Sequence, residues 1–254
     1  MYSLKNLSAG YSNFPVLKNL SLTLQENSFI SLIGPNGSGK TTLLKVLAGL
    51  LDYSGSAKLH DKELRKISRK NFARTVGFVM SAKNFHPSSD FTVKEIIAMG
   101  RLPFMSLFSR LTPHDNNMIY SSAEVLGISG IIDRKILSLS DGQKQLTLLA
   151  CVLAQKTKII LLDEPTSSLD PDKSAMVFSL LRKLADNGKL IIAAVHDINS
   201  AMPFSHGYLA MKDGVLISHG HKLNHEVLEK LYGTEFYAYY DEKGNESMWR
   251  ALPK

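Results

Sequence analysis

A glycine-rich segment near the start of this 254-residue chain has the composition of a phosphate-binding loop. Its spacing is glycine, four residues, then glycine, lysine and threonine, which is the full phosphate-loop pattern. Glycines let backbone amides approach phosphate oxygens, a lysine adds positive charge, and a threonine hydroxyl can bind the accompanying Mg²⁺. The residues expected to bind nucleotide phosphates are Gly34, Pro35, Asn36, Gly37, Ser38, Gly39, Lys40, Thr41 and Thr42.

The flanks of this loop supply the required context. Phe29–Ile33 is a short apolar run that predicts a buried strand, and Lys40–Leu51 has the leucine spacing of a helix. A helix N-terminus adds a partial positive charge beside bound phosphates. We therefore expect Lys40 to act catalytically at the β- and γ-phosphates, and Thr41 to be a ligand of Mg²⁺.

Two adjacent carboxylates follow a second apolar run. Ile159–Leu162 predicts a buried strand, and Asp163 and Glu164 come directly after it. Side chains alternate across a strand, so the two acids should point to opposite sides. Asp163 is expected to hold Mg²⁺, and Glu164 to polarise the water that attacks the terminal phosphate. The pair therefore predicts phosphoryl transfer to water.

The order of the elements indicates an α/β fold. Strands and helices alternate after residue 155, which predicts a parallel sheet flanked by helices, the core of a phosphate-loop NTPase. The opening residues are rich in strand formers and predict an antiparallel β region. Residues 82–155 are helical, with start signals at Thr92, Thr112 and Ser140. We predict one domain over 1–254, with a core of 1–81 and 156–254 and an inserted helical subdomain of 82–155.

The end of the chain predicts a β-hairpin. Phe236–Tyr240 and Met248–Leu252 are the expected strands, and they flank the turn residues Lys243-Gly244-Asn245.

Composition excludes several classes of protein. Hydrophobic residues make up 44% and charged residues 21%, the balance of a folded domain. No apolar run approaches the ~18 residues of a membrane span, and no signal peptide is expected. The single cysteine, Cys151, rules out an internal disulfide and fits a reducing cytosol. A membrane role would therefore have to come through a partner.

Part of the net charge of +7 is concentrated between Lys58 and Arg74. Such a run can contact nucleic acid or anionic lipid, but it is more often a solvated helix face. No aromatic residues alternate with the basic ones as a base-stacking platform requires. We favour the solvated face, and nucleic acid is not expected as a partner.

Three further motifs follow the phosphate loop in order. They are Leu139-Ser140-Asp141-Gly142-Gln143, the run from Leu161 to Asp170, and Val195-His196-Asp197. In this order they resemble the signature, acidic strand, D-loop and switch histidine of the ATP-binding-cassette (ABC) family. The resemblance extends from Tyr11 to about Gly220, and it implies an ATPase whose cofactors are ATP and Mg²⁺.

The resemblance implies a role for each matching residue. Tyr11 corresponds to an aromatic residue that stacks on adenine, although a lone tyrosine can equally be a surface residue. Asp170 corresponds to the D-loop residue at a dimer seam, and His196 to the switch that holds the γ-phosphate and the attacking water. The signature residues, which contact ATP bound by the opposite subunit of a head-to-tail homodimer, are Ser140, Gly142 and Gln143.

The chain departs from the family pattern at three positions. Ser81 stands where a Mg²⁺-binding glutamine is usual, so its hydroxyl is the nearest equivalent ligand. Asp141 replaces a signature glycine and brings an acid near a phosphate site. Leu146 stands where an arginine is common. We therefore expect a modest rate of ATP turnover.

The segment from Thr92 to Phe104 resembles ATPases of iron-siderophore, haem and vitamin B12 importers. The resemblance implies a subunit that couples ATP-driven dimer closure to a membrane permease, with a substrate-binding protein acting indirectly. Such a subunit is cytoplasmic and peripheral on the inner face of the membrane through its permease. The alternative is a soluble ABC ATPase that acts on nucleic acid or the ribosome. A metabolic phosphate-loop kinase would leave the signature and His196 unexplained.

Overall fold

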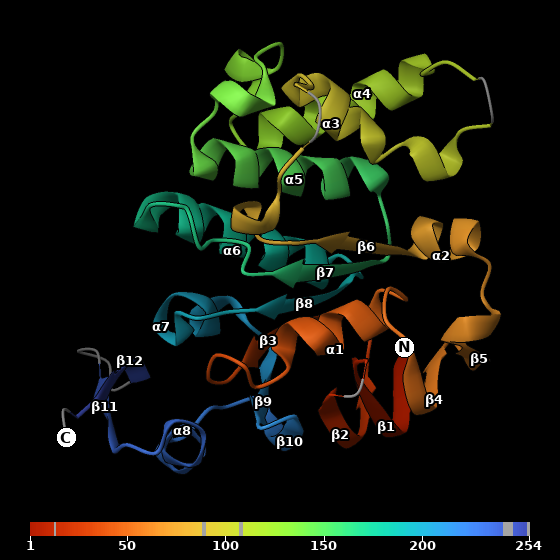
Figure 1. The fold of residues 1–254 in the computed structure, drawn as a ribbon. Helices are drawn as coiled ribbons and strands as arrows, with labels where there is room; N and C mark the ends of the chain where they lie inside the picture. Colours follow the sequence, from red (N-terminus) through yellow and green to blue (C-terminus); the bar gives the residue numbers. More distant parts are fainter. Residues whose placement is uncertain (13, 88–89, 107–108, 241–245, 253–254) are drawn as a thin grey trace.

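A mostly parallel sheet of six strands runs through the middle of the computed structural model (Figure 1). The structure describes residues 1–12, 14–87, 90–106, 109–240 and 246–252. The strand order is β10-β9-β3-β8-β7-β6, and only β10 runs antiparallel to its neighbour. The strands are β3 (Ser28–Ile33), β6 (Val76–Val79), β7 (Ile159–Asp163), β8 (Leu190–Ala194), β9 (Gly207–Lys212) and β10 (Val215–Gly220).

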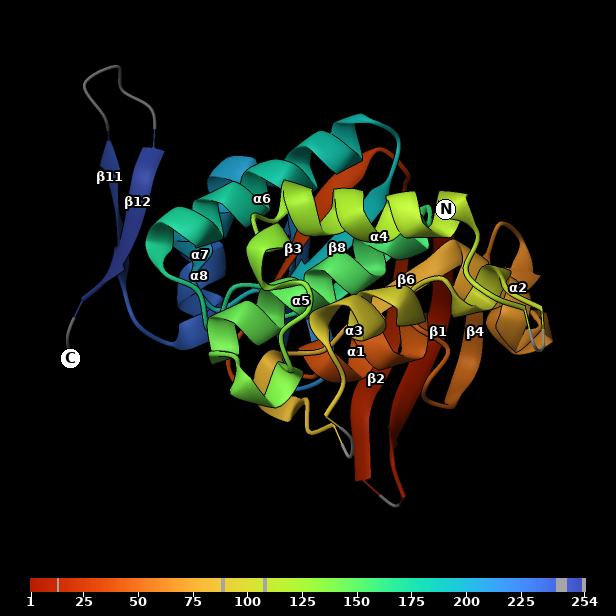
Figure 2. The ribbon, with the colours of Figure 1, turned by 90° about the horizontal axis from the view of Figure 1, so that it is seen from above.

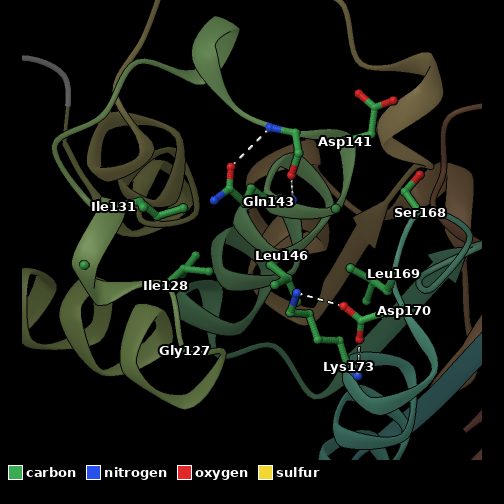
Figure 3. A pocket seen from close by; sticks show the side chains of 13 residues that line it. Gly127, Ile128, Ile131, Asp141, Gln143, Leu146, Ser168, Leu169, Asp170 and Lys173 are labelled. Atoms are coloured by element: carbon green, nitrogen blue, oxygen red, sulfur yellow. Dashed lines mark hydrogen bonds and ion pairs between the residues drawn. The ribbon is translucent and has the colours of Figure 1, made fainter.

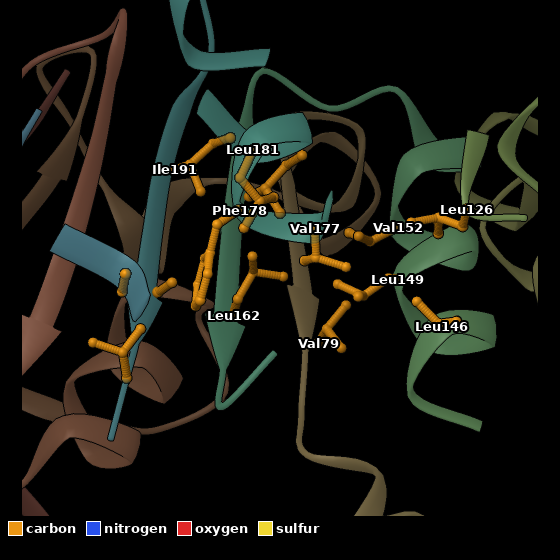
Figure 4. Close-up of a cluster of buried hydrophobic side chains, with 14 of the residues drawn as sticks. Val79, Leu126, Leu146, Leu149, Val152, Leu162, Val177, Phe178, Leu181 and Ile191 are labelled. Carbon is orange, nitrogen blue, oxygen red and sulfur yellow. The ribbon is translucent and has the colours of Figure 1, made fainter. Parts of the chain in front are cut away.

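Helices cover both faces of this sheet (Figure 1). Helix α1 (Lys40–Leu47) lies against one face, and α6 (Pro171–Asp186) packs on the other. Neighbouring strand residues therefore enter different cores: Ile191 packs with Phe178 of α6, whereas Ile192 packs on the α1 side. Figure 4 shows Phe178 between Leu162 of β7 and Ile191 of β8. Burial on both faces explains why these strands are continuous apolar runs.

A second, antiparallel sheet adjoins α1 near the N-terminus (Figure 1). The Tyr2 hydroxyl donates to the Leu47 carbonyl at 2.6 Å and ties this sheet to the end of α1. The expected antiparallel β region is confirmed, but the helix ends four residues before the predicted Leu51 because Gly49 adopts φ +66°. The strands in order are β2 (Phe14–Leu24), β1 (Tyr2–Tyr11), β4 (Tyr53–Leu59) and β5 (Lys62–Glu63).

The described elements between β6 and β7 are helices. Both predicted capping boxes, at Thr92 and Ser140, are present, and Thr112 forms a third with Asp115. The α-helices are α3 (Val93–Met99), α4 (Pro113–Val125) and α5 (Asp141–Gln155). The 3-10 turns are η2 (Ala82–Asn84), η3 (Leu102–Phe104), η4 (Ser129–Ile131) and η5 (Ile136–Ser138). Within the described residues, no helix combines the length and the apolar character needed to cross a membrane.

A buried ion pair holds these helices together. Arg101 Nε donates to Asp115 Oδ1 at 2.8 Å, and a terminal nitrogen of Arg101 donates to the Ala154 carbonyl at 2.7 Å. Both side chains are less than a tenth exposed. One guanidinium therefore links the end of α3, the start of α4 and the end of α5, and leaving either charge unpaired would be costly.

Several basic residues of the run between Lys58 and Arg74 make internal contacts. Arg74 Nε of α2 (Arg69–Thr75) donates to the Pro103 carbonyl at 2.8 Å. Lys70 bonds the Met105 carbonyl, and Arg65 of η1 (Leu64–Lys66) stacks over Tyr53. The Arg74 and Lys70 bonds attach the helical region to α2, a role that the charge pattern alone does not reveal, while all basic residues of the run stay exposed as expected.

The C-terminal elements extend to one side of the molecule (Figure 2). Strands β11 (Phe236–Tyr240) and β12 (Glu246–Ala251) form the predicted hairpin, whose turn at 243–245 lies outside the described residues. The Asn199 side-chain amide makes two hydrogen bonds to the backbone of Trp249. Its Nδ2 donates to the Trp249 carbonyl at 2.9 Å, and its Oδ1 accepts from the Trp249 N–H at 2.7 Å. The remaining helices are α7 (Ile198–Ala201), η6 (Met202–Phe204) and α8 (His225–Tyr232).

We expect Asp115→Ala to lower the free energy of unfolding by about 3 kcal/mol, because it leaves Arg101 buried without its counter-charge. Urea unfolding at neutral pH measures this loss, and Glu124→Ala on the same helix is the exposed control, expected within about 0.5 kcal/mol of the parent.

Hydrogen bonds from Thr112 and Arg101 lower the pKa of Asp115 to about 2. Its contribution to stability should therefore be complete above its unfolded pKa of ~3.9 and be lost as pH falls towards 2. A difference between parent and Asp115→Ala that stays constant from pH 6 to pH 3 would contradict this account.

Candidate active site

The predicted catalytic residues gather where the parallel strands end. Strand β3 leads into the phosphate loop, β7 ends at Asp163, and β8 is followed by His196. In register, Ala194 of β8 pairs with Leu32 of β3 on one side and with Asp163 of β7 on the other. Parallel strands place their carboxyl ends at one edge, which is where α/β sheets bind ligands.

The phosphate loop has the backbone geometry of an anion cradle. Gly34, Gly37 and Gly39 all adopt positive φ, at 149°, 77° and 101°. A Cβ on Gly34 would lie 2.0 Å from the Met211 carbonyl oxygen, so only glycine fits there. The Ser38 hydroxyl is buried without a hydrogen-bond partner among the described residues. A phosphate oxygen would supply the missing partner, so the loop fits a nucleotide.

Lys40 is held inside this loop by its own backbone. Its ammonium donates to the Gly34 and Pro35 carbonyls at 2.7 and 2.9 Å, and only 7% of the residue is exposed. Burial lowers the pKa of Lys40, and the carboxylates of Glu164 and Asp163 oppose that shift. The charge is therefore positioned for phosphate oxygens before any ligand arrives.

Thr41 and Asp163 form the direct link between the loop and β7. The Thr41 hydroxyl donates to Asp163 Oδ2 at 2.8 Å. Burial raises the pKa of Asp163, and the hydrogen bond from Thr41 counteracts part of that shift. A hydroxyl and a carboxylate side by side are the oxygen ligands that Mg²⁺ prefers, so the pair fits this ion.

Glu164 is paired with the switch histidine. Glu164 Oε1 lies 2.5 Å from His196 Nε2, and 27% of the Glu164 side chain is exposed. Its backbone has φ +52°, a conformation that costs free energy and clusters at functional sites, and its N–H donates to the Ala194 carbonyl. The structure thus brings the predicted base and the predicted switch together at the strand ends.

Tyr11 stands at the end of β1, beside α1. Its hydroxyl accepts a hydrogen bond from Lys45 at 3.2 Å, and the same ammonium lies 5.3 Å from the ring centre. Tyr11 is 42% exposed, which leaves ring surface free for an aromatic base. Lys45 was not predicted, although its position four residues after Thr41, on the same helix face, is the signal that places it near the site.

The signature residues line a different pocket, of about 630 Å³ (Figure 3). Ser140 caps α5 by accepting from the Gln143 N–H, and Gln143 Oε1 accepts from the Ser140 N–H. A Cβ on Gly142 would lie 2.8 Å from the Ser168 carbonyl oxygen, so glycine permits the close approach of α5 to the loop after Glu164. Asp170, which caps α6, bonds Lys173 at the rim.

The signature pocket and the phosphate loop are separate in one chain. Within the described ranges, no hydrogen bond joins Ser140, Gly142 or Gln143 to residues 34–42. The described lining of the signature pocket also includes none of the phosphate-loop residues, so the two are separate features of one chain.

The three unusual positions have distinct surroundings. The Ser81 hydroxyl lies 3.3 Å from that of Ser167 and is 3% exposed. Asp141 forms an exposed ion pair with Lys144 at 3.3 Å. Leu146 is buried and packs with the apolar core near Val79 and Leu149 (Figure 4).

Comparison with known proteins identifies relatives over most of the chain. The family profile described as ABC transporter matches residues 17–167. The ferric enterobactin transport ATP-binding protein FepC of Escherichia coli (strain K12) is 33% identical, and the match covers 90% of this chain and 86% of that protein. The iron(3+)-hydroxamate import ATP-binding protein FhuC of Bacillus subtilis (strain 168) is 34% identical, covering 86% of this chain and 81% of that protein.

Solved structures share the fold. An ABC transporter described as metal-chelate type, in an inward-facing conformation, superposes with a TM-score of 0.83 at 26% identity, covering 99% of this chain and 97% of that chain. A dimeric ATP-binding cassette, MJ0796, bound to ADP and phosphate, gives a TM-score of 0.76 at 26% identity, covering 88% of this chain and all of that one.

The profile spans more than half of the chain, and the two relatives match at least four fifths of it at more than 30% identity. With the phosphate loop, Asp163, Glu164 and His196 at one sheet edge, the chain belongs to the ABC transporter family and is an ATP-binding-cassette ATPase.

Proposed function

We propose that the chain is the ATP-hydrolysing subunit of an importer of iron chelates, such as siderophores or haem, or of vitamin B12. The observation that carries the proposal is the match to the ferric enterobactin and iron(3+)-hydroxamate proteins over at least four fifths of this chain. The segment from Thr92 to Phe104, with its buried Arg101, supports the same class of importer.

ATP hydrolysis would use the residues at the sheet edge. Mg²⁺ would be held by Thr41 and Asp163 and would neutralise charge on the terminal phosphates. Lys40 and the loop amides stabilise the charge that spreads over the phosphate oxygens. Glu164 orients the attacking water, and His196 fixes the carboxylate in place.

A head-to-tail homodimer would complete each site. The described lining of the signature pocket contains no phosphate-loop residue, so a second copy can bring its signature to the first copy's ATP. The solved dimeric cassette with ADP and phosphate supports this arrangement. ATP would then act as the bridge between copies, and hydrolysis would release it.

The permease would contact the helical region. Met99, Leu102 and Phe104 expose 38%, 60% and 38% of their surface on α3 and η3, within the segment that resembles importer ATPases. The chain would then lie at the cytoplasmic face of the membrane, held there by its permease, and the substrate-binding protein would be reached only through the permease. The basic run, part of which is engaged internally, gives little support to a nucleic-acid or ribosome partner.

Capture from native membranes tests the proposed partner. A tagged chain, solubilised in mild detergent, should recover a polytopic permease identified by mass spectrometry. Leu102→Asp, at an exposed position, should lose the permease while still binding ATP. Cells that lack the chain should also lose uptake of a ferric chelate. Recovery of ribosomes or nucleic acid in place of a permease would leave the ATPase chemistry intact and overturn the transport proposal.

We expect Glu164→Gln to bind ATP but to abolish turnover, because the amide cannot polarise the attacking water. Unhydrolysed ATP should then hold two copies together. Light scattering after size exclusion should show a dimer with Mg·ATP and a monomer without nucleotide. The exposed Glu226→Gln is the matched control and should keep parental turnover. A Glu164→Gln chain that binds Mg·ATP and stays monomeric would contradict the ATP-bridged dimer.

Asp141 should weaken dimer closure, because it places a carboxylate beside the signature, where the partner's γ-phosphate would bind. Lys144 offsets this charge only in part, since the pair is exposed. In the Glu164→Gln background, Asp141→Gly should lower the ATP concentration for half-maximal dimer formation about threefold at low salt. The gain should shrink in 0.5 M NaCl, where exposed charges are screened. An unchanged midpoint at both salt concentrations would show that Asp141 does not oppose closure.

A further inference from the structure

The segment that follows β6 is anchored to α5 by a buried hydrogen bond. The Ala82 N–H donates to Gln145 Oε1 at 2.7 Å, and Gln145 has no exposed surface. The Nε2 of the same amide is buried and has no partner among the described residues. Gln145 therefore bonds this segment through its side-chain oxygen alone. The signature forms the first turn of α5, so the same helix also determines the position of Ser81.

Ser81 connects this anchored segment to the loop that follows Glu164. Its hydroxyl lies 3.3 Å from the Ser167 hydroxyl, and Ser81 is almost fully buried. The Ser167 N–H donates to the Glu164 carbonyl at 3.3 Å. A short path of contacts thus runs from Gln145 through Ala82, Ser81 and Ser167 to the backbone of the catalytic glutamate.

Glu164 needs such support, because its backbone is held at φ +52°. Strained residues keep their conformation only when surrounding contacts fix them. The Ala194 carbonyl holds Glu164 from the β8 side, and Ser167 closes the turn from the other side. The Thr41 hydroxyl already bonds Asp163, whereas the Ser81 hydroxyl is directed to Ser167.

We propose that Ser81 is a positioning residue for Glu164, acting through Ser167, and that it is not a ligand of Mg²⁺. This inference rests on the proposed Mg²⁺ site at Thr41 and Asp163. In the family this position usually holds a metal-binding glutamine. In this chain, Ser81 at the same position would have a different task. Because Ala82 bonds Gln145 of α5, the position of Ser81, and through it that of Glu164, depends on where α5 lies.

A double-mutant cycle tests the proposal on the full chain. The variants are Ser81→Ala, Ser167→Ala and the combination, and Ser167→Thr retains the hydroxyl. Ser54→Ala, which removes an exposed serine hydroxyl of the N-terminal sheet, is the control. Two quantities are measured: the single-turnover rate of ATP hydrolysis, and the Mg²⁺ concentration for half-maximal binding of a fluorescent ATP analogue.

We expect each alanine variant to slow single turnover about fivefold, because the loss of one ordinary hydrogen bond slows a step by about this factor. The combination should be no slower than either single change, since both remove the same contact. Ser167→Thr and Ser54→Ala should stay within twofold of the parent. The Mg²⁺ midpoint should stay within twofold in every variant.

Other outcomes would overturn the proposal. A Mg²⁺ midpoint raised fivefold or more by Ser81→Ala but not by Ser167→Ala would make Ser81 a metal ligand. Additive slowing, or parental rates in both single variants, would show that the two serines are not coupled to Glu164. Measurements on the unmodified chain distinguish a failure of the proposed metal site from a failure of this inference. If its nucleotide binding did not depend on Mg²⁺, the metal site would be wrong, while the cycle in single-turnover rates would still report on Ser81 and Glu164.

Discussion

The parallel pairing of β3, β8 and β7 is the constraint on which the rest of the site depends. Ala194 lies between Leu32 and Asp163 in register, so the ends of three strands meet within two strand spacings. Both faces of the sheet are buried under α1 and α6, and the charged side chains gather at the strand ends. The Thr41–Asp163 hydrogen bond then joins the phosphate loop to the acidic strand without any ligand.

Burial at the strand ends disfavours the charged forms of both Lys40 and Asp163. It lowers the pKa of Lys40 and raises that of Asp163, while each group partly offsets the shift of the other. A phosphate and a divalent cation would bring the complementary charges. The backbone strain at Glu164 belongs to the same design, since a rigid sheet edge can hold a conformation that an isolated turn would relax.

Local patterns in the sequence were sufficient for much of this architecture. The phosphate loop, the acidic strand end and the capping boxes at Thr92 and Ser140 each lie within a few consecutive residues, and their chemistry dictates their conformation. The end of α1 was placed four residues too late because leucine spacing continues past Gly49. A single glycine at positive φ outweighed that periodicity.

Contacts between distant segments could not be predicted in the same way. Ser81 meets Ser167 across 86 residues, and Ala82 meets Gln145 across 63, with no pattern that marks either pair. Arg74 and Lys70 belong to the basic run, which is exposed as expected, and they also bond the backbone around η3. Such contacts depend on how helices pack on the sheet, which single-sequence periodicity does not encode.

The separation of the phosphate loop from the signature pocket gives these distant contacts their importance. In the proposed head-to-tail dimer, the phosphate loop before α1 and the signature at the start of α5 would both have to keep a fixed position relative to Glu164, so that the signature of one copy can meet the ATP of the other. Gln145 bonds the start of α5 to the segment after β6. Arg101 bonds the end of α5 to α4 and to the end of α3. The bonds of α2 to η3 add a third attachment. The helical region is therefore connected to the rest of the chain at several points, and the Gln145 contact is the one that leads through Ser81 and Ser167 to the backbone of Glu164.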